Sequence, residues 1–247
     1  MDSRRRKQLI LASVALAPPL ILAGAIFGGR LASYFFAPPL QPGEQTAIEL
    51  LWASAFPGES EPEAPYALYD AASRIRNRSE TKGIQRFEYR FELLGANGEA
   101  LVTRQGTGYI RSGEVKYVIE NSLASALTPE RVRFSTGAMA VVDDDGSESS
   151  PAVLIGREYG GGVLAGRVLN QAAVGFNRVD VGAVLFDASG TAFGARATHF
   201  SRFLPREERG FELRWANPGA VASYEVEVTT NVLDPANYIA PERSSIQ

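Results

Sequence analysis

The clearest alternation of apolar and polar residues in the chain runs from Phe87 to Leu93. Its apolar members are Phe87, Tyr89, Phe91 and Leu93, and its charged members are Glu88, Arg90 and Glu92. Because successive side chains of a strand point to opposite faces, this pattern predicts a strand with one buried face. Asn97 and Gly98 follow it, and both residue types accept a positive φ, so the sequence predicts a hairpin turn there.

The same pattern returns 92 to 94 residues later, in the same order of segments. The apolar positions of the second copy are Val179, Val181, Ala183 and Leu185, and a turn follows at 188–191. Upstream, 74–77 matches 167–170, and downstream 109–119 matches 203–213. Two copies of one fold explain such ordered self-similarity. Short strands at spacings near ten residues then predict a mainly β protein with two tandem immunoglobulin- or fibronectin-like β-sandwiches.

The repeat sets the expected domain boundaries. We expect the first domain at 45–137 and the second at 151–235, followed by a tail at 236–247. Residues 143–151 are acidic and rich in serine, which predicts a solvated linker between the copies, placed at 138–150. The segment from Thr46 to Phe56 suits either a strand or a helix, and we interpret it as the first strand.

A run without charged residues extends from Leu9 to Gly29. As a helix it would span about 31 Å, close to the hydrocarbon thickness of a bilayer. We therefore expect a membrane anchor at 9–36, preceded by a basic tail at 1–8 and followed by a proline-rich neck at 37–44. A cleaved signal peptide is the alternative. The basic residues before the run favour a cytoplasmic N-terminus, which leaves the later domains extracytoplasmic.

The two repeated units, 77–98 and 170–190, resemble the FxLyD domain and the related late-embryogenesis-abundant type 2 group. Phe91 and Leu93 match the first half of the FxLyD signature, and 185–187 match its second half. The resemblance implies an immunoglobulin-like or fibronectin-like sandwich on an extracytoplasmic bacterial protein. An anchor followed by two such domains is also similar to bacterial membrane-anchored proteins, a resemblance that implies no catalytic residues.

Charge and cysteine content exclude several classes of function. The formal net charge is -3, but from Leu31 onward 20 basic residues stand against 27 acidic ones. An acidic body repels phosphate backbones, so we expect no nucleic acid among the partners. The sequence contains no cysteine, which excludes disulfides and thiolate metal sites.

Few residues are candidates for catalysis or metal binding. His199 is the single histidine, and its counterpart in the first copy is taken as Gln105, so we expect an exposed strand position. The acidic run 143–145 has the oxygen ligands for calcium but lacks the spacing of a calcium loop. The glycines at 160–162 lack the Lys-Ser/Thr pair of a phosphate loop, so we interpret them as a turn or bulge.

Two further features receive structural interpretations. Glu207 and Glu208 lie at an expected turn, and only Glu114 occurs in the equivalent loop of the first copy, which does not favour a glycosidase pair. Asn77 begins a glycosylation sequon, but its repetition as Asn170 without the sequon indicates a role in a turn. We expect no catalytic, cofactor-binding or metal-binding residue, and no enzyme.

Two hypotheses about function remain open. The first is a membrane-anchored extracytoplasmic binding or scaffold protein, in contact with the lipid bilayer and with an envelope protein partner. The alternative is an accessory subunit of a membrane assembly, contacted through the transmembrane helix. Gly24, Gly28 and Gly29 would give that helix a face of small residues suited to close packing. The sequence does not indicate an oligomeric state.

Overall fold

The computed structural model describes residues 47–59, 63–146, 150–216 and 218–239. These ranges are mainly β, as expected, with 13 strands and one short 3-10 helix, η1 (Pro235–Asn237). Residues 43–247 form one compact unit. The anchor expected at 9–36 lies outside the described residues, and no helix within them is long and apolar enough to cross a bilayer.

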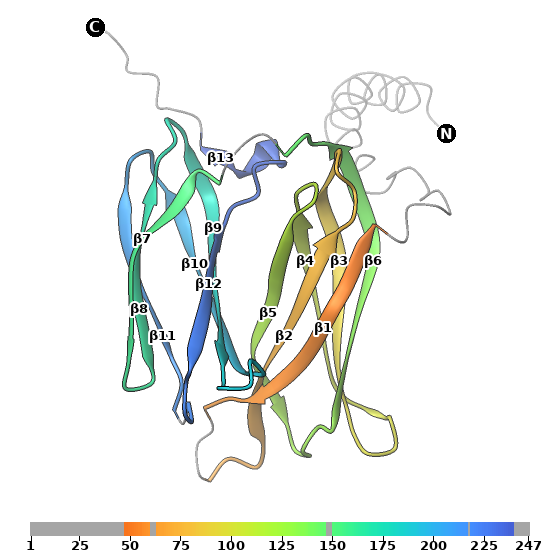
Figure 1. Ribbon diagram of the computed structural model, residues 1–247. Helices are drawn as coiled ribbons and strands as arrows, with labels where there is room; N and C mark the ends of the chain where they lie inside the picture. The colour runs from red at the N-terminus through yellow and green to blue at the C-terminus, as the bar shows by residue number, and fades with distance from the viewer. Residues whose placement is uncertain (1–46, 60–62, 147–149, 217, 240–247) are drawn as a thin grey trace, which may run out of the picture. The chain divides into compact units, whose positions relative to one another are not determined.

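The first half of the compact unit contains two antiparallel sheets of three strands (Figure 1). Its strands are β1 (Ile48–Pro57), β2 (Ala67–Asn77), β3 (Lys82–Leu94), β4 (Ala100–Ile110), β5 (Val115–Ser125) and β6 (Arg131–Asp143). One sheet has the order β1-β2-β5 and the other β4-β3-β6. β1 confirms the strand that was expected between Thr46 and Phe56 for the part of that segment from residue 48 onward.

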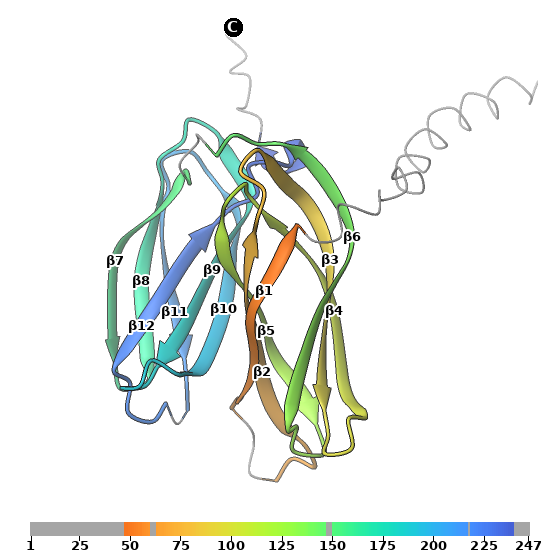
Figure 2. The ribbon, with the colours of Figure 1, turned by 45° about the vertical axis from the view of Figure 1, so that its right-hand side comes forward.

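The second half repeats this arrangement strand for strand (Figure 2). Its strands are β7 (Ala152–Gly160), β8 (Val163–Asn170), β9 (Gly175–Phe186), β10 (Ala192–Phe203), β11 (Glu208–Arg214), β12 (Ser223–Thr229) and β13 (Tyr238–Ile239). One sheet has the order β7-β8-β11 and the other β10-β9-β12, with β13 paired to the beginning of β9. Each half therefore has the layering of a β-sandwich.

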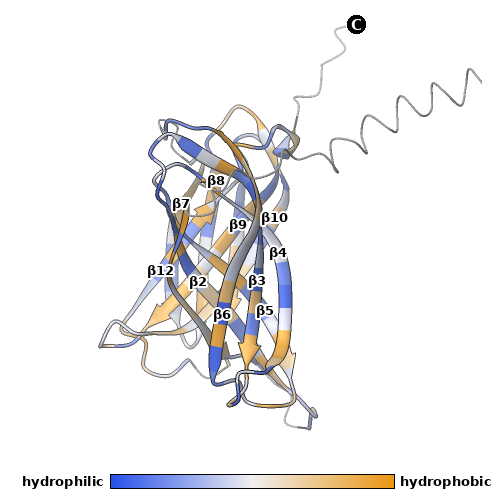
Figure 3. Ribbon diagram, turned by 90° about the vertical axis from the view of Figure 1, so that its right-hand side faces the viewer, coloured by the Kyte–Doolittle hydropathy of each residue, from blue (hydrophilic) through white to orange (hydrophobic). Residues whose placement is uncertain are grey.

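Each half has its own apolar core between its two sheets. Phe87, Phe91 and Leu93 are fully buried in the first core, and the half-buried Tyr89 packs against it. The matching positions in β9 are also fully buried: Val179, Val181, Ala183 and Leu185. Figure 3 shows the resulting alternation of apolar and polar residues along the strands. The predicted inward face is confirmed in both halves.

Large and small residues exchange places between the two cores. In the first half, Phe87 and Tyr89 face Gly108 and Gly106 across the β3–β4 ladder. A Cβ on Gly106 would lie 2.4 Å from the Tyr89 ring, so the ring occupies the space above the glycine. In the second half, the equivalent pairs are Val179 with Phe200 and Val181 with Thr198. Close packing is thus reached by two different solutions at the same positions.

A buried asparagine ends the second strand of each half. The Asn77 amide donates to the carbonyls of Lys82 and Arg111, and its oxygen accepts from the Ser79 N–H. The Asn170 amide likewise donates to the carbonyls of Val174 and Leu204, and its oxygen accepts from the Ala172 N–H. The expected turn role of Asn77 is confirmed, and its amide nitrogen is already occupied.

The linker begins later than the sequence pattern indicates. β6 continues to Asp143, so residues 138–143 belong to the first half rather than to the linker. Asp144, expected to be solvated, is buried. Its carboxylate accepts from the Arg111 guanidinium at 2.6 Å and from the Ser112 N–H at 2.8 Å. The acidic segment is therefore attached to the first half by Asp144.

Candidate functional site: a polar cleft between the two halves

The two halves share an apolar contact. From the first half it contains Phe56, Ala72 and Tyr117, and from the second Val184 and Ala195. Trp52 and Ile119 pack beside them. Val184 and Leu185 are adjacent in β9 yet both fully buried, because one faces the other half and the other faces the core of its own half. Apolar burial thus joins the sandwiches, as it joins partners in stable interfaces.

Two polar contacts fix the register of this interface. The buried Asp70 carboxylate accepts from Arg196 of the second half at 3.1 Å and from the Ser122 N–H at 2.9 Å. The Asn121 side chain forms two hydrogen bonds with the backbone of Ala197, donating to its carbonyl and accepting from its N–H. The side chain thereby pairs with the free edge of β10 as a neighbouring strand would.

A polar cleft of about 930 Å³ lies beside this contact. β4 and β5 of the first half line one wall, and β9, β10, β12 and the segment around η1 line the other. The cleft therefore exists only where the two halves meet. Ligand sites are concave and often formed at domain interfaces, so this cleft is the candidate binding site.

The first wall carries charged side chains that extend from the interior of the first sandwich. Lys116 is 6% exposed, and its ammonium lies 3.6 Å from the centroid of the Tyr109 ring, in a cation–π contact. Glu120 accepts a hydrogen bond from the Tyr89 hydroxyl at 2.7 Å and lies 3.9 Å from the Arg104 guanidinium. Burial, together with the Glu120 carboxylate, raises the pKa of Tyr89, so its phenol remains a donor at neutral pH.

The second wall carries a matching set of polar groups. Arg178 donates to Asp180 at 2.6 Å, and both lie on β9. Glu227 on β12 accepts from the Tyr117 N–H at 2.8 Å, so this contact also joins the two halves. Burial raises the pKa of Glu227 to about 7, against the opposing effects of that hydrogen bond and of the Lys116 charge. Glu227 therefore exchanges its proton near neutral pH.

The structure places His199 at this cleft, exposed on β10. His199 pairs with Asp180 in the ladder as Thr107 pairs with Glu88, so its counterpart in the first half is Thr107, not Gln105. The Asp180 carboxylate is bound to Arg178, and the described residues contain no group of three or more side chains that could hold a metal ion.

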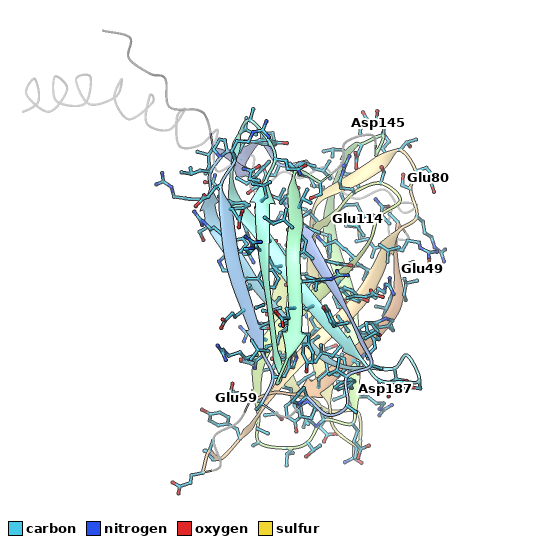
Figure 4. All side chains as sticks on the ribbon, turned by 60° about the vertical axis from the view of Figure 1, so that its left-hand side comes forward. Glu49, Glu59, Glu80, Glu114, Asp145 and Asp187 are labelled. Carbon is cyan, nitrogen blue, oxygen red and sulfur yellow. The ribbon has the colours of Figure 1, made fainter. Side chains whose placement is uncertain are left out.

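The other residues considered in the sequence have structural positions. Gly161 and Gly162 have φ values of 57° and 78° and form the hairpin turn between β7 and β8. The Glu207 carboxylate accepts from the Leu204 N–H, as the Glu114 carboxylate accepts from the Arg111 N–H, so each stabilises a turn. In Figure 4, Glu59 lies at the opposite end of the first half from Glu80 and Glu114.

Sequence reasoning missed the cleft residues Lys116, Glu120 and Glu227. The strand registers place Glu120 at the position of Leu213 and Ile119 at that of Glu212, so the sequence match of 109–119 with 203–213 is wrong by one residue. That shift hid the replacement of an apolar residue by a charged one. Nothing in the alternation of β12 indicates that Glu227 contacts another domain.

No family model matches the sequence, and no curated protein matches it. Among solved structures, the chain is similar to red sea bream transglutaminase, with 12% identity and a TM-score of 0.24 over 74% of this chain and 31% of that one. It is also similar to the Northeast Structural Genomics Consortium target SoR45, with 16% identity and a TM-score of 0.19 over 70% of this chain and 90% of that one. With TM-scores this low, neither likeness supports an inference about this chain.

Proposed function

We propose that this protein is a non-enzymatic binding or scaffold module held at the membrane by residues 9–36. In this proposal two immunoglobulin-like sandwiches stand outside the cytoplasm and bind a partner or ligand in the cleft between them. The observation that carries the proposal is the cleft itself, which both halves build from charged side chains. The apolar run and the basic residues before it support the anchor and its orientation.

The absence of catalytic activity is proposed on chemical grounds. The chain has a single histidine and no cysteine, so most nucleophile and general-base pairs would depend on His199 alone. Asp180, which pairs with His199 across the β9–β10 ladder, accepts a hydrogen bond from Arg178, so this acid is part of an ion pair on its own strand.

A capture experiment from envelope extracts tests the binding proposal. The bait is the full chain, as wild type and as two charge-reversal variants, Arg104→Glu in the cleft and Glu88→Lys on the exposed outer face of β3. We expect a bound component that wild type and Glu88→Lys retain and Arg104→Glu loses. Equal capture by all three baits would place binding outside the cleft and contradict the proposal.

The anchor is tested separately. Protease added outside spheroplasts should degrade the region after residue 36, while a tag before Arg4 survives. If replacement of residues 9–36 by an unrelated anchor abolished association while the cleft stayed intact, the accessory-subunit alternative would replace the binding module.

A further inference from the structure

The two sandwiches differ most at the opening between their fourth and fifth strands. In the second half the residues that face inward there are Phe200 on β10 and Phe211 and Leu213 on β11, all of them buried. This half therefore closes its opening with apolar side chains. The fold itself requires no polar group at these positions.

The first half fills the same opening differently, because the Phe87 ring occupies the space above Gly108 and a charged group stands at the edge. The strand registers place Gly108, Val118 and Glu120 at the positions of Phe200, Phe211 and Leu213. Two large rings and one leucine are thus replaced by a glycine, a valine and a carboxylate. A partly buried carboxylate needs partners, and Glu120 has two of them, the Tyr89 hydroxyl and the Arg104 guanidinium.

Two ion pairs line the cleft, one from each half. Arg104 and Glu120 extend from the first half, and Arg178 and Asp180 from the second. The Tyr89 hydroxyl, which donates to Glu120, lines the cleft together with Arg178 and Asp180. The cleft therefore has carboxylate acceptors and guanidinium donors on both walls.

With every carboxylate ionised, the formal charges that line the cleft cancel. Its basic side chains are Arg86, Arg104, Lys116 and Arg178, and its acidic ones are Glu120, Asp180, Glu227 and Asp234. A site for a polyanion or a polycation would carry an excess of one sign. A balanced lining of donors and acceptors instead suits a neutral ligand whose groups both donate and accept hydrogen bonds, as hydroxyl groups do.

We infer that the cleft binds a neutral, polyhydroxylated ligand, namely an oligosaccharide, with vicinal hydroxyls held between the Arg104–Glu120 and Arg178–Asp180 pairs. The inference rests on the proposed function, because it names the ligand class of the same cleft. Each carboxylate accepts from one hydroxyl and each guanidinium donates to its neighbour. The cleft is large enough for more than one sugar ring, since ligand pockets for small molecules begin at roughly 300 Å³.

The repeat supplies a matched set of variants. Asp180→Asn and Glu120→Gln each remove a carboxylate from the cleft with little change in shape. Glu88→Gln is the control, because Glu88 occupies in β3 the position of Asp180 in β9 but is exposed on the outer face, away from the cleft. All are made in the full chain, reconstituted in nanodiscs, and thermal melts confirm that each variant is folded.

The probes are an array of neutral gluco-, manno- and N-acetylglucosamine oligomers together with the anionic polygalacturonate and sulfated dextran. We expect wild type to bind at least one neutral oligomer, and each cleft variant to bind it about tenfold more weakly, as loss of a charge-assisted hydrogen bond implies. Glu88→Gln should bind like wild type. Competition by the soluble oligomer should release the protein from the array.

Three results would overturn the inference: binding to none of the neutral oligomers, binding to the anionic polymers alone, or equal weakening by Glu88→Gln. These results are distinguishable from failure of the proposed function. A partner that is captured from envelope extracts and lost with Arg104→Glu would still establish the cleft as a binding site, with a ligand of another class.

Discussion

Single residues account for much of the repeated architecture, and the two buried asparagines show how. Asn77 satisfies three backbone groups and Asn170 four, at the point where the second strand ends and the chain crosses to the other sheet. Buried backbone groups require such partners, because leaving them unpaired costs about 1 to 3 kcal/mol each. The sequence shows an asparagine at this position in both copies, and the hydrogen bonds of both side chains confirm that it stabilises a turn.

Phe91 tests the core at the same scale. It is fully buried, with its ring centroid 4.9 Å from that of Phe134, so Phe91→Ala should leave a cavity and reduce the free energy of unfolding by about 3 to 5 kcal/mol. Glu88→Ala, on the exposed face of the same strand, should change it by about 0.5 kcal/mol or less. Denaturant melts of the two variants measure both. Similar losses from both changes would mean that the register of β3 is wrong.

Asp144 makes the free energy of unfolding depend on pH. Burial alone would raise its pKa, but Arg111 and the backbone N–H groups of Ser112 and Gly146 together lower it from 3.8 to about 2. Because the folded state lowers this pKa, the stabilisation is complete above pH 4 and is lost as pH falls towards 2. Asp144→Asn should therefore cost about 2 kcal/mol at pH 7 and much less near pH 2.

Asp143→Asn is the control for this comparison, because the Asp143 side chain is 90% exposed although it pairs with Lys82. Exposed ion pairs contribute little, so this variant should behave like wild type at every pH. Urea melts at a series of pH values give the difference directly. A cost of Asp144→Asn that stayed constant from pH 7 to pH 2 would disprove the ionic role of Asp144.

Among the elements, turns and strand edges follow rules that the sequence displays. The β7–β8 hairpin turns through Gly161 and Gly162, both at positive φ, which is the conformation of a two-residue turn that suits strand twist. The edge strands β1 and β7 each contain an irregularity, at Leu50/Trp52 and Leu154/Gly156. Such bulges protect an exposed edge from pairing with another chain.

Gly162 and Gly160 form a matched pair for testing this hairpin. At Gly162 a Cβ would combine a φ of +78° with a distance of 2.6 Å to the Trp215 carbonyl oxygen, so Gly162→Ala should destabilise the protein by about 1 to 2 kcal/mol. At Gly160 a Cβ would meet nothing within 4 Å, so Gly160→Ala should be close to neutral. Thermal melts compare the two. Equal melting temperatures would contradict the turn geometry.

The strands could largely be predicted from the sequence, whereas contacts between side chains far apart in the sequence could not. Alternation identified the inward face of β3 and β9 because burial of one face imposes a period of two. The linker was expected from residue 138, although 138–142 are apolar and lie in β6. Asp144 was expected in the linker because it is acidic, and the partner that buries it, Arg111, is far away in the sequence. The adjacent apolar residues Val184 and Leu185 do indicate in the sequence that both faces of β9 are buried there, and both residues are buried.

At the scale of the whole molecule, the halves pack through different sheets. The first contributes residues of β1, β2 and β5, and the second residues of β9 and β10. Such a head-to-tail contact could in principle continue to a further copy. The outer sheet of the first half prevents this, because Glu92 and Arg90 occupy the positions that Val184 and Gly182 occupy in the second half. The outer face of β3 therefore lacks the small and apolar residues with which β9 forms this contact.

A fixed contact between the halves is the claim on which the cleft depends. Hydrogen exchange followed by mass spectrometry, with increasing urea, reports the loss of protection of β3 and β9 separately in residues 43–247. We predict that both strands lose protection at one shared urea midpoint. Arg196→Met should lower that midpoint for both strands, because it leaves Asp70 buried without its ion-pair partner. Arg167→Met, which removes an exposed ion pair, should leave the midpoint unchanged. Two separate midpoints, unaffected by Arg196→Met, would show that the halves fold independently and would contradict the account.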